Sequence, residues 1–198
     1  GGLPEDISGW GGMTDMELKQ RGSVRKTYRL ALSFTGEYAA GVDGPNPTTA
    51  GVLSAMTTSM NRVNGIYERE LSVSMVLIGD EDDLIYLDSI ADPFTANDNG
   101  PQLLGQNQIN TDNVVGSAAF DIGHIFSTGG GGIAQLGCVC NMNSKARGVT
   151  GSQNPVGDAY DVDYVAHEMG HQFGASHTFN DCSGNENPST AFEPGSGS

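Results

Sequence analysis

The amino-acid sequence predicts a mixed α/β (α+β) domain, and three features of its first half indicate this class. Every second residue from Tyr28 to Phe34 is large and apolar, which predicts a half-buried strand over 24–34. Apolar residues then recur at helical spacing over 50–70, and a second strand is predicted at 71–78. A helix between two strands favours parallel pairing, because parallel strands need a long crossover connection.

The remaining elements follow from the same kinds of pattern. Thr48 or Thr49 is expected to cap the first helix, because a threonine hydroxyl can accept a hydrogen bond from the first helical turn. Downstream we expect a short strand at 84–87, a polar helix at 102–115, and strands at 119–127 and 133–140. The aspartate-rich segment 80–99 is predicted to be a solvated loop. Its carboxylates leave Ca2+ as a second candidate ion, although their spacing does not match the EF-hand pattern.

Composition narrows the classes of function. The chain has 198 residues, with 24 Asp and Glu against 9 Lys and Arg, and a formal net charge of −15. Such a charge argues against a nucleic-acid partner, since affinity for nucleic acid depends on cations that neutralise phosphates. No apolar run is long enough to predict a membrane span. Charged residues make up only 17% of the chain, which is common among secreted hydrolases, so we expect a secreted protein.

The segment 161–177 carries the most specific chemical signal. It contains the pattern H-E-x-x-H-x-x-G-x-x-H, with histidines at His167, His171 and His177. In an α-helix the first two histidines share one face. The opposite face is apolar and consists of Val162, Val165, Met169 and Phe173. Gly174 can end the helix in a left-handed conformation and bring the third histidine back. Three neutral imidazoles leave one tetrahedral position open, as in a catalytic zinc site.

Glu168 follows the first histidine and is the candidate catalytic residue. Its carboxylate can reach a zinc-activated water without being a ligand itself, which is the position of a general base. A chance match of the short motif to an ordinary amphipathic helix is the alternative, but Gly174 and His177 argue against it. A purely structural zinc site needs no base, so the presence of Glu168 favours a protease over a non-catalytic binding module.

This motif, together with Phe126–Ala134 and Lys145–Gly151, resembles the metzincin zinc peptidases over about 28–180. Within that clan the segments are similar to the bacterial reprolysin-like (adamalysin-like) metalloendopeptidases. The pappalysins are the second choice, because Thr178 follows the third histidine and Cys182 lies nearby. The resemblance implies a five-stranded mixed, twisted sheet over an active-site helix and a backing helix.

The resemblance also implies how a substrate binds. In these peptidases a protein or peptide substrate lies as an extended strand against the edge strand beside the cleft, which here falls within Gly129–Leu136. The candidate substrate-binding residues are Gly131, Gly132, Ile133, Ala134 and Gln135. The unpaired main-chain groups of a sheet edge can accept such a strand.

A further expectation concerns the C-terminal region. Metzincins place a methionine-containing turn beneath the zinc, downstream of the third histidine, but this sequence has no methionine after Met169. We therefore expect an N-terminal extension at 1–23 and a catalytic domain at 24–198 that stops before the Met-turn. The protein's own C-terminal remainder is then a candidate partner.

The other reactive side chains suggest structural roles. Cys138 and Cys140 lie two residues apart and are expected to share a strand face, with a disulfide from Cys182 to one of them. His124 is expected to be a packed or solvent-facing strand histidine, with a substrate contact as the alternative. The aspartates before the ligand helix are expected to be N-terminal caps and partners of the helix dipole: Asp158, Asp161 and Asp163.

Two hypotheses of function follow. The leading hypothesis is a secreted zinc-dependent endopeptidase that hydrolyses internal peptide bonds of proteins. The alternative is a non-catalytic, zinc-stabilised peptide-binding or adhesion module derived from such a protease. Zinc is the expected cofactor in both.

Overall fold

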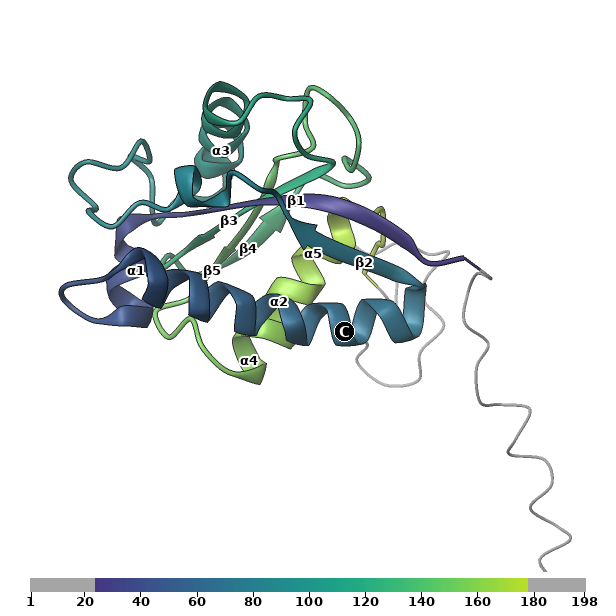
Figure 1. Ribbon diagram of the computed structural model, residues 1–198, viewed down its shortest axis with the longest axis horizontal. Coiled ribbons are helices and arrows are strands. Elements are labelled where there is room, and N and C mark those ends of the chain that lie inside the picture. Colours follow the sequence, from purple (N-terminus) through teal and green to yellow (C-terminus); the bar gives the residue numbers. More distant parts are fainter. Residues whose placement is uncertain (1–23, 178–198) are drawn as a thin grey trace, which may run out of the picture.

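The computed structural model describes residues 24–177, which fold into one five-stranded sheet with helices on both faces. The strands are β1 (Lys26–Phe34), β2 (Val73–Leu77), β3 (Ile122–Ser127), β4 (Gly131–Ala134) and β5 (Gly148–Gly151). The helices are α1 (Gly36–Asp43), α2 (Thr49–Leu71), η2 (Glu81–Leu84), α3 (Gly100–Val114), α4 (Asp158–Tyr160), η3 (Asp161–Ala166) and α5 (His167–Gln172). Figure 1 shows α3 on one face of the sheet and α1, α2, α4 and α5 on the other. The predicted mixed α/β class is confirmed.

The sheet has the strand order β2-β1-β3-β5-β4. β4 runs antiparallel to β5, whereas the other neighbouring strands are parallel. The first parallel pair, β1 with β2, has α2 as its crossover, so the predicted β-α-β opening is confirmed. α2 begins after Thr48, whose hydroxyl accepts a hydrogen bond from the Gly51 amide at 3.0 Å. The helix ends at Ser72, whose left-handed conformation, with φ 56°, turns the chain into β2.

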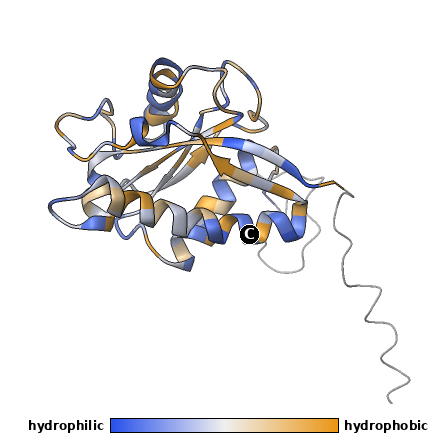
Figure 2. Cartoon of the chain, in the orientation of Figure 1, coloured by the Kyte–Doolittle hydropathy of each residue, from blue (hydrophilic) through white to orange (hydrophobic). Residues whose placement is uncertain are grey.

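Two apolar layers hold the helices against the sheet, and Figure 2 shows hydrophobic residues gathered on the strands between the helical layers. Buried residues of the larger layer, under α2, η3 and α5, include Leu30, Leu32, Phe34, Val52, Met56, Val63, Val165 and Met169. The smaller layer, under α3, contains Leu103, Leu104, Ile125 and Val149. Full burial of one such side chain stabilises the fold by about 1.5–3 kcal/mol. The helix that carries the histidine motif is therefore part of the main core.

Two elements next to β1 differ from the prediction. α1 follows β1 directly, although the sequence pattern predicts no helix there. Its first residue, Gly36, lies so close to the acidic loop that a Cβ would be 2.2 Å from the nitrogen of Ser89. The strand predicted at 84–87 is wrong, because the short 3-10 helix η2 ends at Leu84 and residues 85–87 form no regular secondary structure. Glu81 of η2 points inward and accepts a hydrogen bond from the Leu32 amide at 2.9 Å, beyond the point where β2 stops pairing with β1.

The strand predicted at 133–140 is wrong in its bounds. β4 covers Gly131–Ala134, and positive φ angles at Gly137 and Cys140 turn the following chain out of strand geometry. Cys138 is buried and Cys140 is exposed, so the two thiols do not share a strand face. The glycines of β4 pair through their backbone alone. They give no alternating side-chain pattern, which is why the sequence does not locate this strand.

The two edges of the sheet are treated differently. At the β2 edge, the Asn64 side chain donates to the carbonyl oxygen of Met75 at 2.8 Å and accepts from its amide at 2.9 Å. The side-chain amide of Asn64 thus occupies the main-chain hydrogen-bonding positions of Met75 that a further strand would use. No described strand pairs with the outer side of β4. Within 24–177, β4 is thus the edge that remains open to an added strand.

Some expectations concern residues outside the described range. These are the N-terminal extension at 1–23, the disulfide partner Cys182 and the region where the resemblance places a Met-turn. They stay predictions. Among the helices of residues 24–177, none is long and apolar enough to cross a bilayer.

Candidate functional site

The histidine motif lies on a helix whose first part is wider than an α-helix. η3 is a π-helical segment, and α5 continues it as an α-helix. The hydroxyl of Tyr67 on α2 donates to the carbonyl of Ala166 at 2.7 Å, where the two segments meet. Val165 and Met169 are fully buried, as expected for the apolar face. Val162 is only half-buried, because a π-turn holds more residues than an α-turn and rotates this position away from the core.

The helix ends in a Schellman motif that brings the chain back toward the first two histidines. Gly174 has φ 98°, a left-handed conformation that a residue with a Cβ adopts only at a cost. Its amide donates to the carbonyl of His171, and the amide of Ala175 donates to that of Gly170, both at 2.9 Å. The returning chain places His177 beside the two helical histidines.

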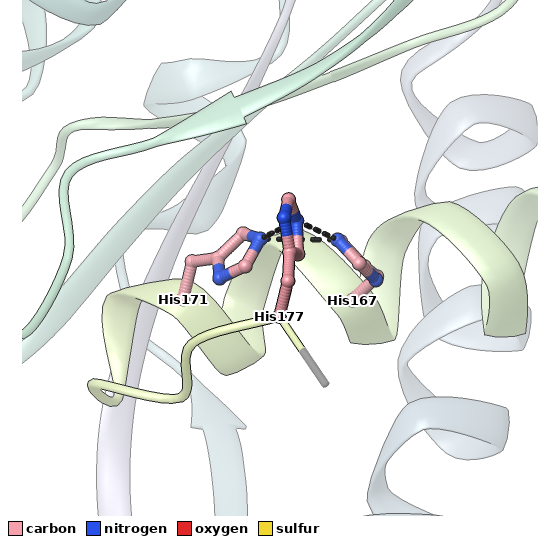
Figure 3. A group of neighbouring side chains, drawn as sticks. All are labelled: His167, His171 and His177. Carbon is pink, nitrogen blue, oxygen red and sulfur yellow. Dashed lines mark hydrogen bonds between the residues drawn. The ribbon is translucent and has the colours of Figure 1, made fainter. Parts of the chain in front are cut away.

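The three imidazoles point toward one another (Figure 3). Their Nε2 atoms form a triangle, with 3.0 Å between His167 and His171, 3.1 Å between His167 and His177, and 2.9 Å between His171 and His177. Two nitrogens on one tetrahedral zinc would be roughly 3.3–3.4 Å apart, given bonds of about 2.0–2.1 Å. The triangle is a few tenths of an ångström tighter, so the donor set fits zinc with little movement.

The protonation of the histidines suits a metal site. The Nδ1 of His171 lies 2.7 Å from the Ala175 carbonyl, which can only accept, so Nδ1 is the protonated nitrogen of the neutral tautomer and Nε2 is the one that offers a lone pair. Burial, and then His171 and His177, lower the pKa of His167. Burial and His171 likewise lower the pKa of His177. Neutral imidazoles with converging lone pairs favour a cation between them.

Glu168 lies beside this triangle under β4. The residue is 6% exposed, and its Oε2 has no hydrogen-bond partner among the described residues. Burial raises the pKa of Glu168 to about 7, while its electrostatic interaction with His171 opposes the rise. A Cβ on Gly132 of β4 would lie 2.5 Å from Oε1, so the absence of a side chain there makes room for this carboxylate.

An open cleft of about 490 Å³ joins these groups. It is lined by Gly132, Ile133, Ala134, Leu136, Glu168, His171, Ser176 and His177. The residues predicted to bind substrate therefore do not all line this cleft. Gly132, Ile133 and Ala134 line this cleft, whereas Gly131 borders a smaller hollow of about 160 Å³ with Asp98 and Ser127. Gln135 follows the end of β4, and its amide donates to the Arg147 carbonyl at 2.9 Å.

Sequence reasoning missed Gln172, which is fully buried behind His171. Its Oε1 lies 2.7 Å from the Nδ1 of His124, a strand histidine that is also fully buried. Burial lowers the pKa of His124 to about 4, so its ring is neutral at pH 7. A polar residue in an apolar strand, 122–126, is the signal that could have drawn attention to this pair.

The prediction for the aspartates before the ligand helix is wrong in part, because Asp158, Asp161 and Asp163 lie in the first turns of α4 and η3, as partners of a helix dipole would, but none of them is an N-cap. The N-cap of α4 is Gly157, and Asp161 is buried instead of capping a helix. Its carboxylate accepts hydrogen bonds from Ser59 at 2.5 Å and from Arg62 at 2.9 Å, both on α2. These bonds tie the start of η3 to α2. Asp158 is the first residue of α4 and also binds Arg62, at 2.8 Å.

Other metal or disulfide sites gain no support from the described residues. Within 24–177, the histidine triad is the one group of three or more His, Cys, Asp or Glu ligand atoms that lies close enough to share an ion. The acidic segment 80–98 supplies no such group for calcium. Cys138 and Cys140 are free thiols, and Cys182 lies outside this range.

Comparison with known families agrees with this geometry. Residues 24–198 match the sequence model of a family described as Metallo-peptidase family M12B Reprolysin-like. No curated protein matches the chain. The family match covers most of the chain, including the histidine triad and the edge strand, and M12 peptidases depend on zinc. The resemblance to reprolysins is thereby confirmed, and the chain belongs to the reprolysin-like metallopeptidases of family M12B.

Proposed function

We propose that this peptidase is a secreted, zinc-dependent endopeptidase that cleaves internal bonds of proteins. His167, His171 and His177 would hold Zn2+, and Glu168 would be the general base. One observation carries the proposal: three imidazole Nε2 atoms and a buried carboxylate meet in one cleft beside an open edge strand.

Glu168 is suited to moving a proton between water and substrate. Zinc, when bound, supplies a Lewis acid that lowers the pKa of a water molecule and polarises the scissile carbonyl. Glu168 then accepts a proton from the attacking water and delivers it to the leaving amine. Its Oε2 has no competing hydrogen bond among the described residues, so this oxygen is free for that exchange.

The substrate would bind as an extended strand along β4. A peptide that adds to this edge exchanges main-chain hydrogen bonds with Gly131–Ala134 and continues past Gln135. Gly132, the β4 residue that lies against Glu168, places no side chain between the peptide backbone and this carboxylate. The Asn64 amide closes the opposite edge at Met75, which favours β4 as the docking edge.

The test compares metal content and hydrolysis of a denatured protein for three variants. Wild type should carry one zinc per chain and yield internal fragments by mass spectrometry. Glu168→Ala should keep its zinc and lose at least about two orders of magnitude in rate, the low end for a general base. His171→Ala should lose the zinc. Glu70→Gln, on the exposed end of α2, is the matched control and should change neither property.

Two results would overturn the proposal. Stoichiometric zinc without hydrolysis by wild type would indicate the zinc-stabilised binding module instead. Release of terminal residues alone would indicate an exopeptidase.

The proposal of secretion rests on the acidic, lysine-poor composition, and recovery of the native protein only from the cell fraction would contradict it.

A further inference from the structure

A chain of buried polar side chains joins the ligand helix to the sheet directly behind His171. We propose that Gln172 and His124, together with Thr150, are positioning residues that hold the metal-binding histidines in register with β4. Gln172, His124 and Thr150 are each 0% exposed. This inference rests on the proposed zinc site.

The hydrogen bonds of this chain have one consistent direction. The Nε2 of Gln172 lies 2.8 Å from the Gly123 carbonyl and 3.4 Å from the Lys145 carbonyl. Carbonyls only accept, so this nitrogen donates and the Oε1 of Gln172 must accept from the Nδ1 of His124, at 2.7 Å. The Nε2 of His124 then keeps a lone pair, and the Thr150 hydroxyl donates to it at 2.9 Å.

The space for this chain depends on a glycine. A Cβ on Gly148 would lie 2.2 Å from the Oε1 of Gln172 and 2.4 Å from the Nδ1 of His124. Gly148 therefore leaves room at the point where the amide and the imidazole meet. The side chains of Gln172, His124 and Thr150 thus pack closely where α5, β3 and β5 meet.

These hydrogen-bonded side chains lie between the metal-binding histidines and β4, the two sides of the cleft. Gln172 directly follows His171 and precedes the turn that leads to His177. On the sheet side, Thr150 pairs with Gly132, and Gly148 pairs with Ala134. The hydrogen bonds thus run from the metal ligands to the strand that pairs with β4.

Apolar packing alone would leave the helix free to rotate or slide by small amounts. Val165 and Met169 press the helix against the core, but such contacts have little directional preference. Hydrogen bonds of Tyr67 and Asp161 tie the first part of the helix to α2, and the Gly137 amide donates to the His171 carbonyl at 2.9 Å. The side-chain hydrogen bonds of Gln172 tie the last turn to β3, and they restrict its rotation further because each has a narrow range of angles. We therefore expect the buried chain to act on the geometry of the ligands as well as on stability.

The decisive comparison is between Gln172→Met and Asn107→Leu. Each replaces a fully buried side-chain amide with an apolar side chain of similar shape. Asn107 lies on α3, on the other face of the sheet, and donates to the Ala146 carbonyl at 2.8 Å. Zinc affinity is measured by chelator competition, and ligand geometry by the visible spectrum of the Co2+-substituted protein. Both variants should have a lower Tm.

Only Gln172→Met should weaken zinc binding, by about tenfold, and shift the Co2+ bands. Equal zinc affinity and an unchanged Co2+ spectrum in Gln172→Met would overturn the inference, because a merely structural role predicts that result. If Gln172→Met does not fold, Thr150→Val and Thr150→Ser decide. The valine variant, which lacks the hydroxyl, should shift the Co2+ bands, and the serine variant should not. Identical spectra for the two would refute the inference.

The same experiment keeps the two proposals apart. Wild type that binds no zinc, or His171→Ala that binds as tightly as wild type, would refute the metal site itself. Wild type that binds zinc normally, with Gln172→Met unchanged, would refute only the positioning role.

Discussion

Replacement of Gly132 by alanine should separate catalysis from metal binding. A Cβ at this position would lie 2.4 Å from the Cγ of Glu168, 2.5 Å from its Oε1 and 2.6 Å from its Cδ. Ordinary contacts of a Cβ are 3.4–4 Å, so the carboxylate or β4 must move by about 1 Å (3.4 − 2.4). The three atoms nearest to such a Cβ all belong to Glu168 and none to a histidine of the triad.

A displacement of this size is large for a general base. A misplacement of 1 Å in an active site can lower the rate about 10²-fold, and crowding of this kind costs about 1–3 kcal/mol of stability. We therefore expect Gly132→Ala to bind zinc like wild type and to hydrolyse protein about a hundred times more slowly. The loss should appear in kcat, since the proton-transfer step is the one disturbed.

The assay is kcat and KM for an internally quenched peptide, with zinc content measured on the same samples. Gly65→Ala is the control, because it makes the same substitution on exposed α2, where a Cβ meets nothing within 4 Å. It should keep full activity. A kcat for Gly132→Ala within threefold of wild type would refute the reasoning, since it would mean that Glu168 need not lie where the structure places it.

Two further predictions concern stability. Glu81 is 4% exposed and burial raises its pKa to about 8, so between pH 4.5 and about 8 the folded state keeps a proton that the unfolded state releases. The free energy of unfolding should therefore fall as pH rises through this window, by at most about 1.4 kcal/mol per pH unit. In urea titrations at several pH values, Glu81→Gln should lose this dependence. The same dependence of unfolding free energy on pH in both proteins would contradict the prediction. Asn64→Leu should leave the main-chain groups of Met75 unpaired, cost about 1–3 kcal/mol and increase self-association in light scattering. A variant as stable and as dispersed as wild type would show that the amide does not protect the edge.

The parts of the fold that the sequence predicts are those with local signals. β1, α2 and β2 have regular apolar periods, and the Thr48 cap marks where the helix begins. The histidine motif lies in one continuous segment, so helical geometry and one glycine turn suffice to bring its members together. In each case the information lies within a few neighbouring residues.

The parts that the sequence does not predict depend on distant partners. Gln172 and His124 are 48 positions apart, and neither reveals the other. Half of β4 is glycine, so its pairing is visible only in the backbone hydrogen bonds to β5. The inward turn of Glu81 depends on the free amide of Leu32, which lies far away in the chain. Such features require the folded backbone to be known first.

The short chain segment that holds all three histidines has a consequence for partly unfolded protein. Closing a loop costs chain entropy that grows with its length, and the loops between His167, His171 and His177 are very short. The approach of Gly132 to Glu168, by contrast, closes a much longer loop and needs the sheet. With zinc at the proposed site, a chain whose sheet has opened should therefore still hold the ion, at the weaker affinity that we expect without the Gln172 contacts, when it can no longer hold a peptide. Zinc content should thus report local order around the histidines, whereas hydrolysis should report that the whole domain is folded.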